Sequence, residues 1–219
     1  MDLRIQYLRK YVLWGGIALA ALIFWPMHWM GFTLPKLFIL HLILGVSCLL
    51  MLFDRQMWKA RVLPLGMVLG YFCLQIIYSV FSPAPLVSFL GVSESLQGLL
   101  TQLMYLNVFL LALQISDEEK EWGFRIILAV NGVVVFYALL QALGLDPLLS
   151  AWDSEWFLGR VFSTLGHPNW LGVWLLLTFP LVLRIKKHRA LWVTLQVGAL
   201  VLTGSKAAFL GFAVFLLGM

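Results

Sequence analysis

Arg160 is the residue whose type and setting best suit a chemical role in this sequence. It lies in the segment Gly159-Arg-Val-Phe-Ser-Thr-Leu-Gly-His-Pro-Asn169, just before a long apolar run. A guanidinium presents its N–H donors as a planar fork, which binds phosphate or diphosphate oxygens through paired hydrogen bonds. The alternative is an arginine at a membrane interface that extends toward lipid phosphates without binding a substrate. The residue pattern leaves both roles open.

Lys206 is the second basic residue of interest, because it follows the turn Thr203-Gly204-Ser205 between two apolar runs. We expect it to lie at the same membrane face as Arg160, which favours a joint role in binding an anion. The alternative is an ordinary turn lysine. The sequence lacks a nucleophile elbow, a His-Glu-x-x-His metal motif and a phosphate-binding loop with its upstream glycine. We therefore predict no metal ion and no cofactor.

The four histidines carry weaker signals. His167 precedes a proline and is typical of a residue that caps the start of a helix. His28 and His41, together with Lys36, lie near the expected outer ends of two apolar runs. There they either line a polar cavity or serve in packing, and packing is favoured since no partner is apparent. His188 belongs to a basic stretch and indicates topology.

The elements that position these residues follow from an extreme composition. Of 219 residues, 62% are hydrophobic and 11% are charged, and the mean hydropathy is +0.95. Soluble domains are about 45–50% apolar and about 25% charged, since much of their surface must face water. The composition therefore predicts an integral membrane protein. Cys48 and Cys73 fall inside apolar runs, and we expect buried thiols there rather than a disulfide or a metal site.

The apolar runs predict helices, because backbone polar groups have no water partner in lipid and must be satisfied within the chain. About 20 residues of helix cross the roughly 30 Å of hydrocarbon. We therefore expect an all-α bundle of about eight transmembrane helices in a single membrane domain. The predicted spans are residues 11–30, 34–53, 62–81, 99–115, 126–143, 169–185, 191–203 and 207–219. Asn107 and Asn131 lie within them, where a side-chain amide is expected to bind a neighbouring helix.

The distribution of Lys and Arg predicts the orientation. With a cytoplasmic N-terminus and alternating helices, 12 basic residues fall in inside segments and 3 fall outside. The inside residues are Arg4, Arg9, Lys10, Arg55, Lys59, Arg61, Lys120, Arg125, Arg184, Lys186, Lys187 and Arg189. The outside residues are Lys36, Arg160 and Lys206. This is the positive-inside pattern, so the positive net charge indicates topology rather than a surface for nucleic acid.

A longer outer segment, residues 144–168, precedes the sixth predicted span. Asp146-Pro147 is typical of an N-cap followed by proline at the first helical position, and Trp152 and Trp156 share one face after it. We therefore expect a short helix in the outer interface. The last run ends about 13 residues after the turn. Because this is shorter than a span, we expect the N-terminal part of a longer protein; a half-spanning helix is the alternative.

Two segments resemble a known family. Residues 160–171, Arg-Val-Phe-Ser-Thr-Leu-Gly-His-Pro-Asn-Trp-Leu, resemble the Arg-x-x-Gly-Thr-x-x-Asn-Pro-Asn-x-Leu segment of the O-antigen ligase and Wzy-type polymerase superfamily. Residues 202–211, Leu-Thr-Gly-Ser-Lys-Ala-Ala-Phe-Leu-Gly, are similar to its Thr-x-Ser-Arg-Gly-Ala-x-Leu turn. Residues 91–100 are similar to a weaker family feature. The likeness in hydropathy covers nearly the whole chain, whereas the specific motifs occupy some twenty residues.

The resemblance implies a GT-C-like membrane fold and glycosyl transfer at the outer face of a bacterial cytoplasmic membrane. The donor would be a glycan on undecaprenyl diphosphate, and the acceptor a hydroxyl of lipid A-core, of another envelope glycan or of a protein. At the matching positions, Arg160 and Lys206 would bind the lipid diphosphate, and Thr164, Asn169 and Ser205 would support the motifs. Basic residues would stabilise the leaving group in place of a metal, and a histidine would act as general base.

The chain departs from the family at several positions. Ser163 stands where a glycine is usual, His167 where an asparagine is common, and Lys206 where the turn has an arginine. Family members are longer and carry the histidine base in a late outer loop, which none of the four histidines here matches. No catalytic residue is therefore identified, and we expect this chain alone to be inactive as a transferase.

Several alternatives stay open at this stage. Ligase and polymerase share these motifs, so the sequence does not separate them. A non-enzymatic transporter or flippase for the same lipid-linked glycans is a second possibility, although no internal repeat of the kind that transporters show is apparent. A membrane assembly factor without chemistry is a third.

Overall fold

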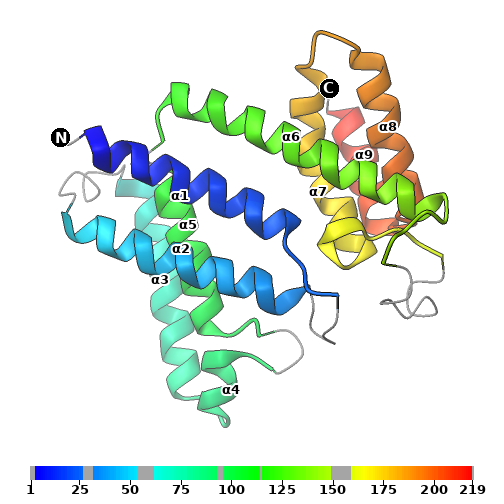
Figure 1. Ribbon diagram of the computed structural model, residues 1–219. Coiled ribbons are helices and arrows are strands. Elements are labelled where there is room, and N and C mark those ends of the chain that lie inside the picture. The colour runs from blue at the N-terminus through cyan, green and yellow to red at the C-terminus, as the bar shows by residue number, and fades with distance from the viewer. Residues whose placement is uncertain are drawn as a thin grey trace. The chain divides into compact units, whose positions relative to one another are not determined.

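The computed structural model describes residues 3–26, 32–53, 62–92, 96–113, 115–148 and 159–218. These residues form helices and turns and contain no strand, which confirms the predicted all-α class (Figure 1). The helices are α1 Leu3–Leu22, α2 Thr33–Phe53, α3 Val62–Val80, α4 Pro85–Leu90, α5 Leu99–Ala112, α6 Asp117–Ala142, the 3-10 turn η4 Ser163–Leu165, α7 Pro168–Leu183, α8 Arg189–Leu202 and α9 Lys206–Leu217.

The predicted runs and the observed helices differ mainly at three places. Helix α1 covers Leu3–Leu22 rather than 11–30, so the basic N-terminal residues continue the helix instead of preceding it. Helix α4 was not predicted, and it begins with Pro85 at a position where the missing N–H of proline has no cost. Helix α6 begins at Asp117 rather than near 126.

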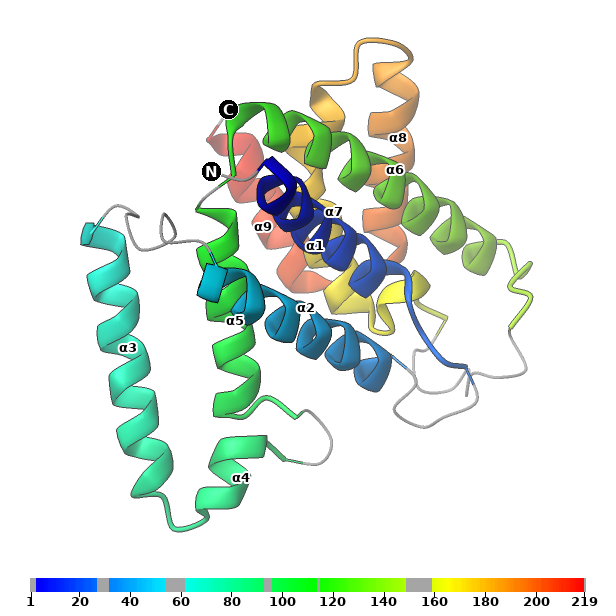
Figure 2. The same cartoon turned by 60° about the vertical axis from the view of Figure 1, so that its left-hand side comes forward.

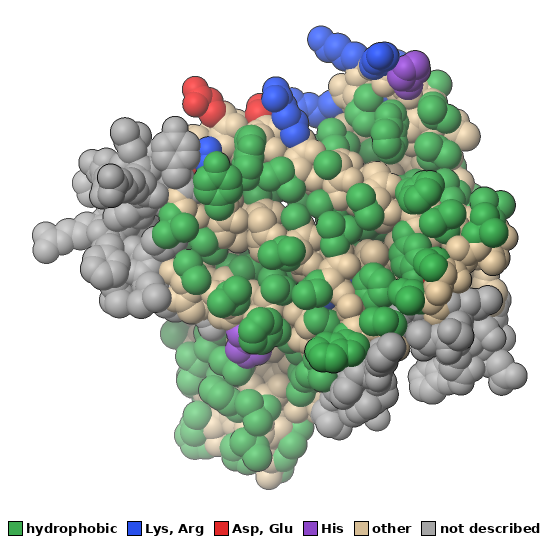
Figure 3. Space-filling view, viewed as in Figure 1, with side chains coloured by type: hydrophobic (Ala, Val, Ile, Leu, Met, Phe, Trp, Pro, Cys, Tyr) green, Lys and Arg blue, Asp and Glu red, His purple; other side chains and the backbone are tan. Residues whose placement is uncertain are grey.

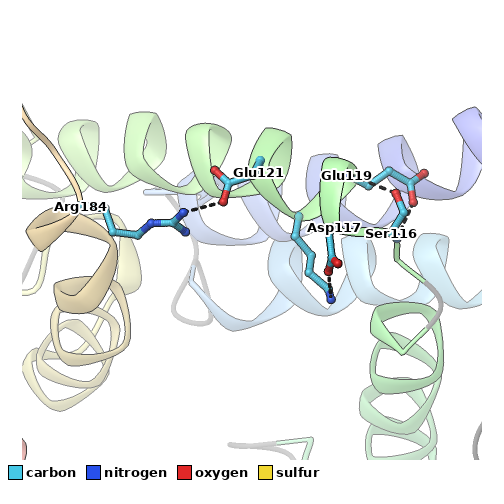
Figure 4. Close-up of polar contacts among 6 residues, drawn as sticks. Ser116, Asp117, Glu119, Glu121 and Arg184 are labelled. Carbon is cyan, nitrogen blue, oxygen red and sulfur yellow. Dashed lines mark hydrogen bonds and ion pairs between the residues drawn. The ribbon is translucent and has the colours of Figure 1, made fainter.

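Polar residues explain the early start of α6 (Figure 4). The backbone N–H of Ser116 donates to Glu119 Oε2 at 2.9 Å, and the N–H of Glu119 donates to Ser116 Oγ at 3.3 Å. This reciprocal capping box satisfies two N–H groups that a helix start otherwise leaves unpaired. Lys120 also lies 2.7 Å from Asp117, one turn apart on the same exposed face. The first turns of α6 are therefore stabilised by local polar contacts rather than by apolar burial.

By length and composition, one of the described helices is a candidate to cross a membrane. Among the described residues, only Asp117–Ala142 is both long and apolar enough to span a bilayer, and the other apolar helical stretches run to 10–17 residues. At 1.5 Å per residue these correspond to about 15–26 Å, which is less than the roughly 30 Å of hydrocarbon. The helix lengths thus do not by themselves support the predicted bundle of eight spans.

The chain divides into two compact units. The first comprises Met1–Ala20 and Lys36–Lys120, where α3, α4 and α5 pack against one another (Figure 2). In this unit α1 and α2 approach closely, because a Cβ on Gly16 would collide with the side chain of Ile43. Cys73 was expected to be buried but is an exposed free thiol on α3, since α3 presents most of its side chains outward.

The second unit comprises Ala21–Pro35 and Glu121–Met219. Here α7 packs against both α8 and α9. The core contains a polar cluster rather than apolar side chains alone. Asn131 Nδ2 donates to Gln196 Oε1 at 2.8 Å, while Asn131 Oδ1 accepts from Trp174 Nε1 at 3.1 Å and from the Thr178 hydroxyl at 2.9 Å. The expectation that Asn131 binds a neighbouring helix is confirmed, because its partners lie on α7 and α8.

We predict that Asn131→Leu lowers the free energy of unfolding by about 1–3 kcal/mol, because it removes the donor to the buried Gln196 Oε1 and the acceptor of Trp174 Nε1. Asn107→Leu is the matched control. Asn107 is also a buried amide within a helix, but its Oδ1 has no hydrogen-bond partner among the described residues. Replacing it should leave stability unchanged or slightly raised. Thermal unfolding of the purified protein in detergent measures both, and equal losses for the two variants would contradict the assignment.

Candidate functional site

Arg160 joins the two sequence motifs in the second unit. Its Nε donates to the carbonyl oxygen of Thr203 at 2.7 Å, and its Nη2 donates to Asn169 Oδ1 at 3.1 Å. The backbone adds a contact, since Val161 N–H donates to Leu202 O at 3.3 Å. Residues 43 positions apart are thereby brought together, so the guanidinium lies between the end of α8 and the start of α7.

Gly204 makes this approach possible. Its backbone has φ of +58°, in the left-handed region that favours glycine, and a Cβ there would lie 3.2 Å from Arg160 Nε. The turn that separates α8 from α9 therefore serves two purposes. It reverses the chain, and it leaves room for the guanidinium beside the backbone.

Two helices begin at this site. Helix α7 starts at Pro168 with His167 as N-cap, and helix α9 starts at Lys206 with Ser205 as N-cap. The N-terminal parts of the two helices are in contact, because a Cβ on Gly172 in the second turn of α7 would lie 2.6 Å from Ala208 Cβ. Helix starts carry a partial positive charge and unpaired N–H groups, which makes them suited to anions. Ser205 Oγ accepts from Ala208 N–H, so the earlier N–H groups of α9 remain for an external acceptor.

His167 lies beside the guanidinium of Arg160. It is the N-cap of α7, which confirms the role predicted for it. Its Nδ1 accepts a hydrogen bond from the N–H of Asn169 at 3.1 Å. Burial lowers the pKa of His167 below its usual value, and the positive charge of Arg160 lowers that pKa further. Both effects favour the neutral imidazole, which is also the form that can accept this hydrogen bond at Nδ1.

The segment that carries Arg160 is fixed to α6 and to the end of α1. Gln141 Oε1 accepts from the N–H groups of Phe162 and Ser163, at 3.1 and 2.7 Å. Ser163 Oγ donates to Val134 O at 2.7 Å, and Thr164 Oγ1 donates to Ala21 O at 2.8 Å. Each of these bonds restrains residues 162–164, so Arg160 is presented by a rigid turn.

Ser163 occupies a strained backbone position. It has φ of +51°, a conformation that L side chains rarely adopt and that costs about 1–2 kcal/mol. Its hydroxyl bond to Val134 and its N–H bond to Gln141 hold it there. Gln141 was not among the residues expected at this site, and its signal in the sequence is an amide in the last turn of an otherwise apolar run.

The structure gathers most of the predicted site residues in the second unit. Arg160 and Asn169 are bonded to each other, Ser205 caps α9, and Thr164 supports the turn. Lys206 is exposed at the first position of α9, at the same end of the unit.

Other predicted residues fall elsewhere. Lys36 belongs to the first unit, where its Nζ donates to Ala20 O at 2.9 Å, and His41 Nδ1 lies 2.7 Å from Leu37 O. His28 and the predicted interfacial helix with Trp152 and Trp156 lie outside the described residues. Asp146 Oδ1 accepts from Leu148 N–H at 2.9 Å, and residues 147 and 148 form a turn; the helix that Asp146 was predicted to cap lies outside the described residues.

Comparison with known proteins adds no relative. No protein-family model, no curated protein and no solved structure matches the chain. The residues around Arg160 and their geometry are therefore the basis for a function.

We predict that Gly204→Ala lowers the stability of the protein by more than the backbone strain of alanine at this position accounts for. Gly144→Ala is the matched control, because Gly144 also has a left-handed φ of +72° but has open space around its Cβ position. The control should cost about 1 kcal/mol of stability, the strain of one left-handed residue. Gly204→Ala should cost more, since it also displaces Arg160. Thermal unfolding in detergent compares the two variants, and equal losses would show that Arg160 does not depend on this glycine.

The lowered pKa of His167 predicts a pH-dependent stability. The unfolded chain binds a proton near the ordinary value of 6.5, whereas the folded protein resists protonation until a lower pH. The contribution of His167 to the free energy of unfolding is therefore fully present above pH 6.5. It is lost as the pH falls from 6.5 toward the lowered pKa of the folded protein. His167→Asn keeps an acceptor at the N-cap but does not titrate, so it should flatten this part of the profile. Melting temperatures between pH 7.5 and pH 5 test this, and identical slopes for the two proteins would contradict it.

Proposed function

We propose that this chain is a polytopic membrane protein that acts in glycosyl transfer, as an O-antigen ligase-like or polymerase-like protein. The donor would be a glycan on undecaprenyl diphosphate, and the acceptor a hydroxyl at the outer face of the bacterial cytoplasmic membrane. The observation that carries the proposal is the Arg160 guanidinium, held by Thr203 O and Asn169 Oδ1 between the starts of α7 and α9.

This arrangement suits a diphosphate leaving group. Toward the residues that the structure describes, Arg160 uses two of its five N–H donors, at Nε and Nη2, so three remain for a ligand. Two helix starts and the exposed Lys206 add positive potential at the same place. Fixed donors that face a developing negative charge lower a reaction barrier without further reorganisation. The site would therefore favour departure of the lipid diphosphate as the glycosidic bond breaks.

The motif residues support the family resemblance through their geometry. Asn169 orients the guanidinium, and Ser205 caps the helix that carries Lys206. Ser163, which stands where the family has glycine, has the left-handed backbone that glycine favours. None of these contacts identifies a general base. At His167, Nδ1 already accepts the N–H of Asn169.

Membrane placement is supported by the surface of the second unit. Large apolar side chains are exposed along its helices, among them Phe136 at 63%, Leu177 at 72% and Leu210 at 68%. Contact of these apolar side chains with lipid costs no free energy, whereas their exposure to water is unfavourable. The eight-span arrangement belongs to the proposal, and its shorter helices would require local thinning of the bilayer.

The two ends of the second unit also fit the proposed orientation. The ion pair between Arg184 and Glu121, at 2.6 Å, joins the end of α7 to the first turns of α6 (Figure 4). The basic α7–α8 turn therefore lies at the opposite end of these helices from Arg160 and Lys206. This separation agrees with the proposal that the basic α7–α8 turn faces the cytoplasm and that Arg160 and Lys206 lie at the outer face.

Deletion of the gene, followed by complementation with the whole gene rather than with these 219 residues alone, tests the function. The deletion should cause a lipid-linked glycan to accumulate at the outer face and should abolish its transfer to the acceptor. Arg160→Ala should restore about 1% of wild-type transfer or less, in line with the loss of one fixed donor at an anionic leaving group. Arg160→Lys should restore more than Ala, because it keeps the charge but loses the fork.

Arg184→Ala is the matched control for the complementation. It removes an arginine from the other end of the same unit, where the side chain is exposed, and should support normal transfer. Normal transfer with Arg160→Ala would overturn the proposal. Accumulation of the donor at the cytoplasmic face instead would indicate a flippase.

A further inference from the structure

A narrow groove opens between α6, α7 and α8, at some distance in sequence from the Arg160 site. Its volume is about 230 Å³. The lining residues are Leu128, Ala129, Asn131, Gly132, Val182, Ile185 and Trp192. Pockets for drug-sized ligands occupy about 300–1,000 Å³, so this groove suits a thinner apolar segment, such as part of one acyl chain. Asn131 does not make the wall polar, because its amide is engaged with Gln196, Trp174 and Thr178.

One end of the groove is basic. Arg125 precedes Leu128 and Ala129 by three and four residues, so it shares their face of α6 one turn nearer the start of the helix. Side chains on a helix lean toward its N-terminus, which directs the guanidinium away from the apolar walls. On the other wall, Ile185 is followed directly by the exposed Lys186 and Lys187. Both walls of the groove therefore end in positive charge.

The charge at this end is not neutralised within the unit. Figure 3 shows Lys, Arg and His side chains gathered over the turn between α7 and α8. Glu121 is the nearby carboxylate on α6, and it pairs with Arg184 at 2.6 Å. Arg125, Lys186 and Lys187 have no ion pair among the residues that the structure describes. An apolar groove that ends in unpaired cations is complementary to a ligand with a chain and an anionic head.

We propose that this groove binds one anionic phospholipid of the cytoplasmic leaflet. One acyl chain would lie against Leu128 and Ala129, beside the Trp192 ring that packs on Gly132, and the phosphate would contact Arg125 and Lys186. Trp192, in the first turn of α8, suits the level where headgroups meet acyl chains. The proposal rests on the membrane placement proposed above, but it does not depend on glycosyl transfer.

A second groove shows why charge is the deciding feature. It lies between α3 and α5, within the first unit, and its volume of about 370 Å³ is larger. Its lining is Val68, Tyr71, Phe72, Gln102, Tyr105, Leu106 and Phe109, with no lysine or arginine. Size and apolarity alone would favour lipid binding here. Because no cation lines this groove, we expect it to show no preference for an anionic lipid.

The test measures lipid binding to the purified full chain in detergent by native mass spectrometry. The probes are dioleoyl phosphatidylglycerol and dioleoyl phosphatidylcholine, which share acyl chains and differ in charge. The wild type should prefer the anionic lipid. Arg125→Gln and Lys186→Gln should each weaken its binding about fivefold and leave the zwitterionic lipid unaffected. Ala129→Phe, at an exposed position of the wall, should fill the groove and remove the preference.

The control variants are Leu106→Phe in the second groove and Lys120→Gln, which removes an exposed lysine that is already paired with Asp117, and neither should change the preference. Equal binding of the two lipids by the wild type would overturn the proposal, as would an unchanged preference in Ala129→Phe. Melting temperatures without added lipid verify folding, and Ala129→Leu replaces the larger variant if that variant unfolds. Transfer in cells that carry Ala129→Phe should stay normal, so failure here and failure of the Arg160 proposal are separate results.

Discussion

The hydrogen bonds of the Arg160 guanidinium connect the segments on which the proposed function depends. One bond reaches the carbonyl of Thr203 at the end of α8, and the other reaches the side chain of Asn169 in the first turn of α7. A single side chain thus fixes the distance between two helix starts, because α9 begins only two residues after Gly204. The approach requires a glycine at that turn, and the rigid support of residues 162–164 keeps the guanidinium in place.

Positive charge lies at both ends of the second unit, but the side chains are held in place at one end and exposed at the other. At the Arg160 end, the charge is held by hydrogen bonds and by the starts of α7 and α9, which suits the binding of one anion in one geometry. At the other end, the charges around the α7–α8 turn are exposed, and among the residues that the structure describes the ion pair there joins Arg184 to Glu121. Exposed charges of this kind orient a chain in a membrane and attract anionic lipid, since neither task requires a fixed geometry.

The sequence predicted the helices, because these depend on local patterns, and it placed Lys206 at the same membrane face as Arg160 without predicting a contact between the two motifs. Apolar runs located α2, α3, α5, α7, α8 and α9 to within a few residues, and Arg160 does lie against the turn before Lys206. The early start of α6 was missed although Ser116 and Glu119 form a recognisable capping box, since these polar residues lie outside the apolar run. The partners of Asn131 and Gln141 were not predictable, because they are chosen by packing between residues that lie 21–65 positions apart.

The most direct measurement of the central claim is the binding of a short isoprenoid diphosphate by the purified chain. Isothermal titration in detergent would compare farnesyl diphosphate with farnesol, which lacks the two phosphates, in the wild type and in Arg160→Gln. The account predicts that the wild type binds the diphosphate at least about tenfold more tightly than the variant does, because hydrogen bonds to a charged group are lost, while farnesol shows no such difference. Equal affinity of the two proteins for farnesyl diphosphate would contradict an anion site at Arg160.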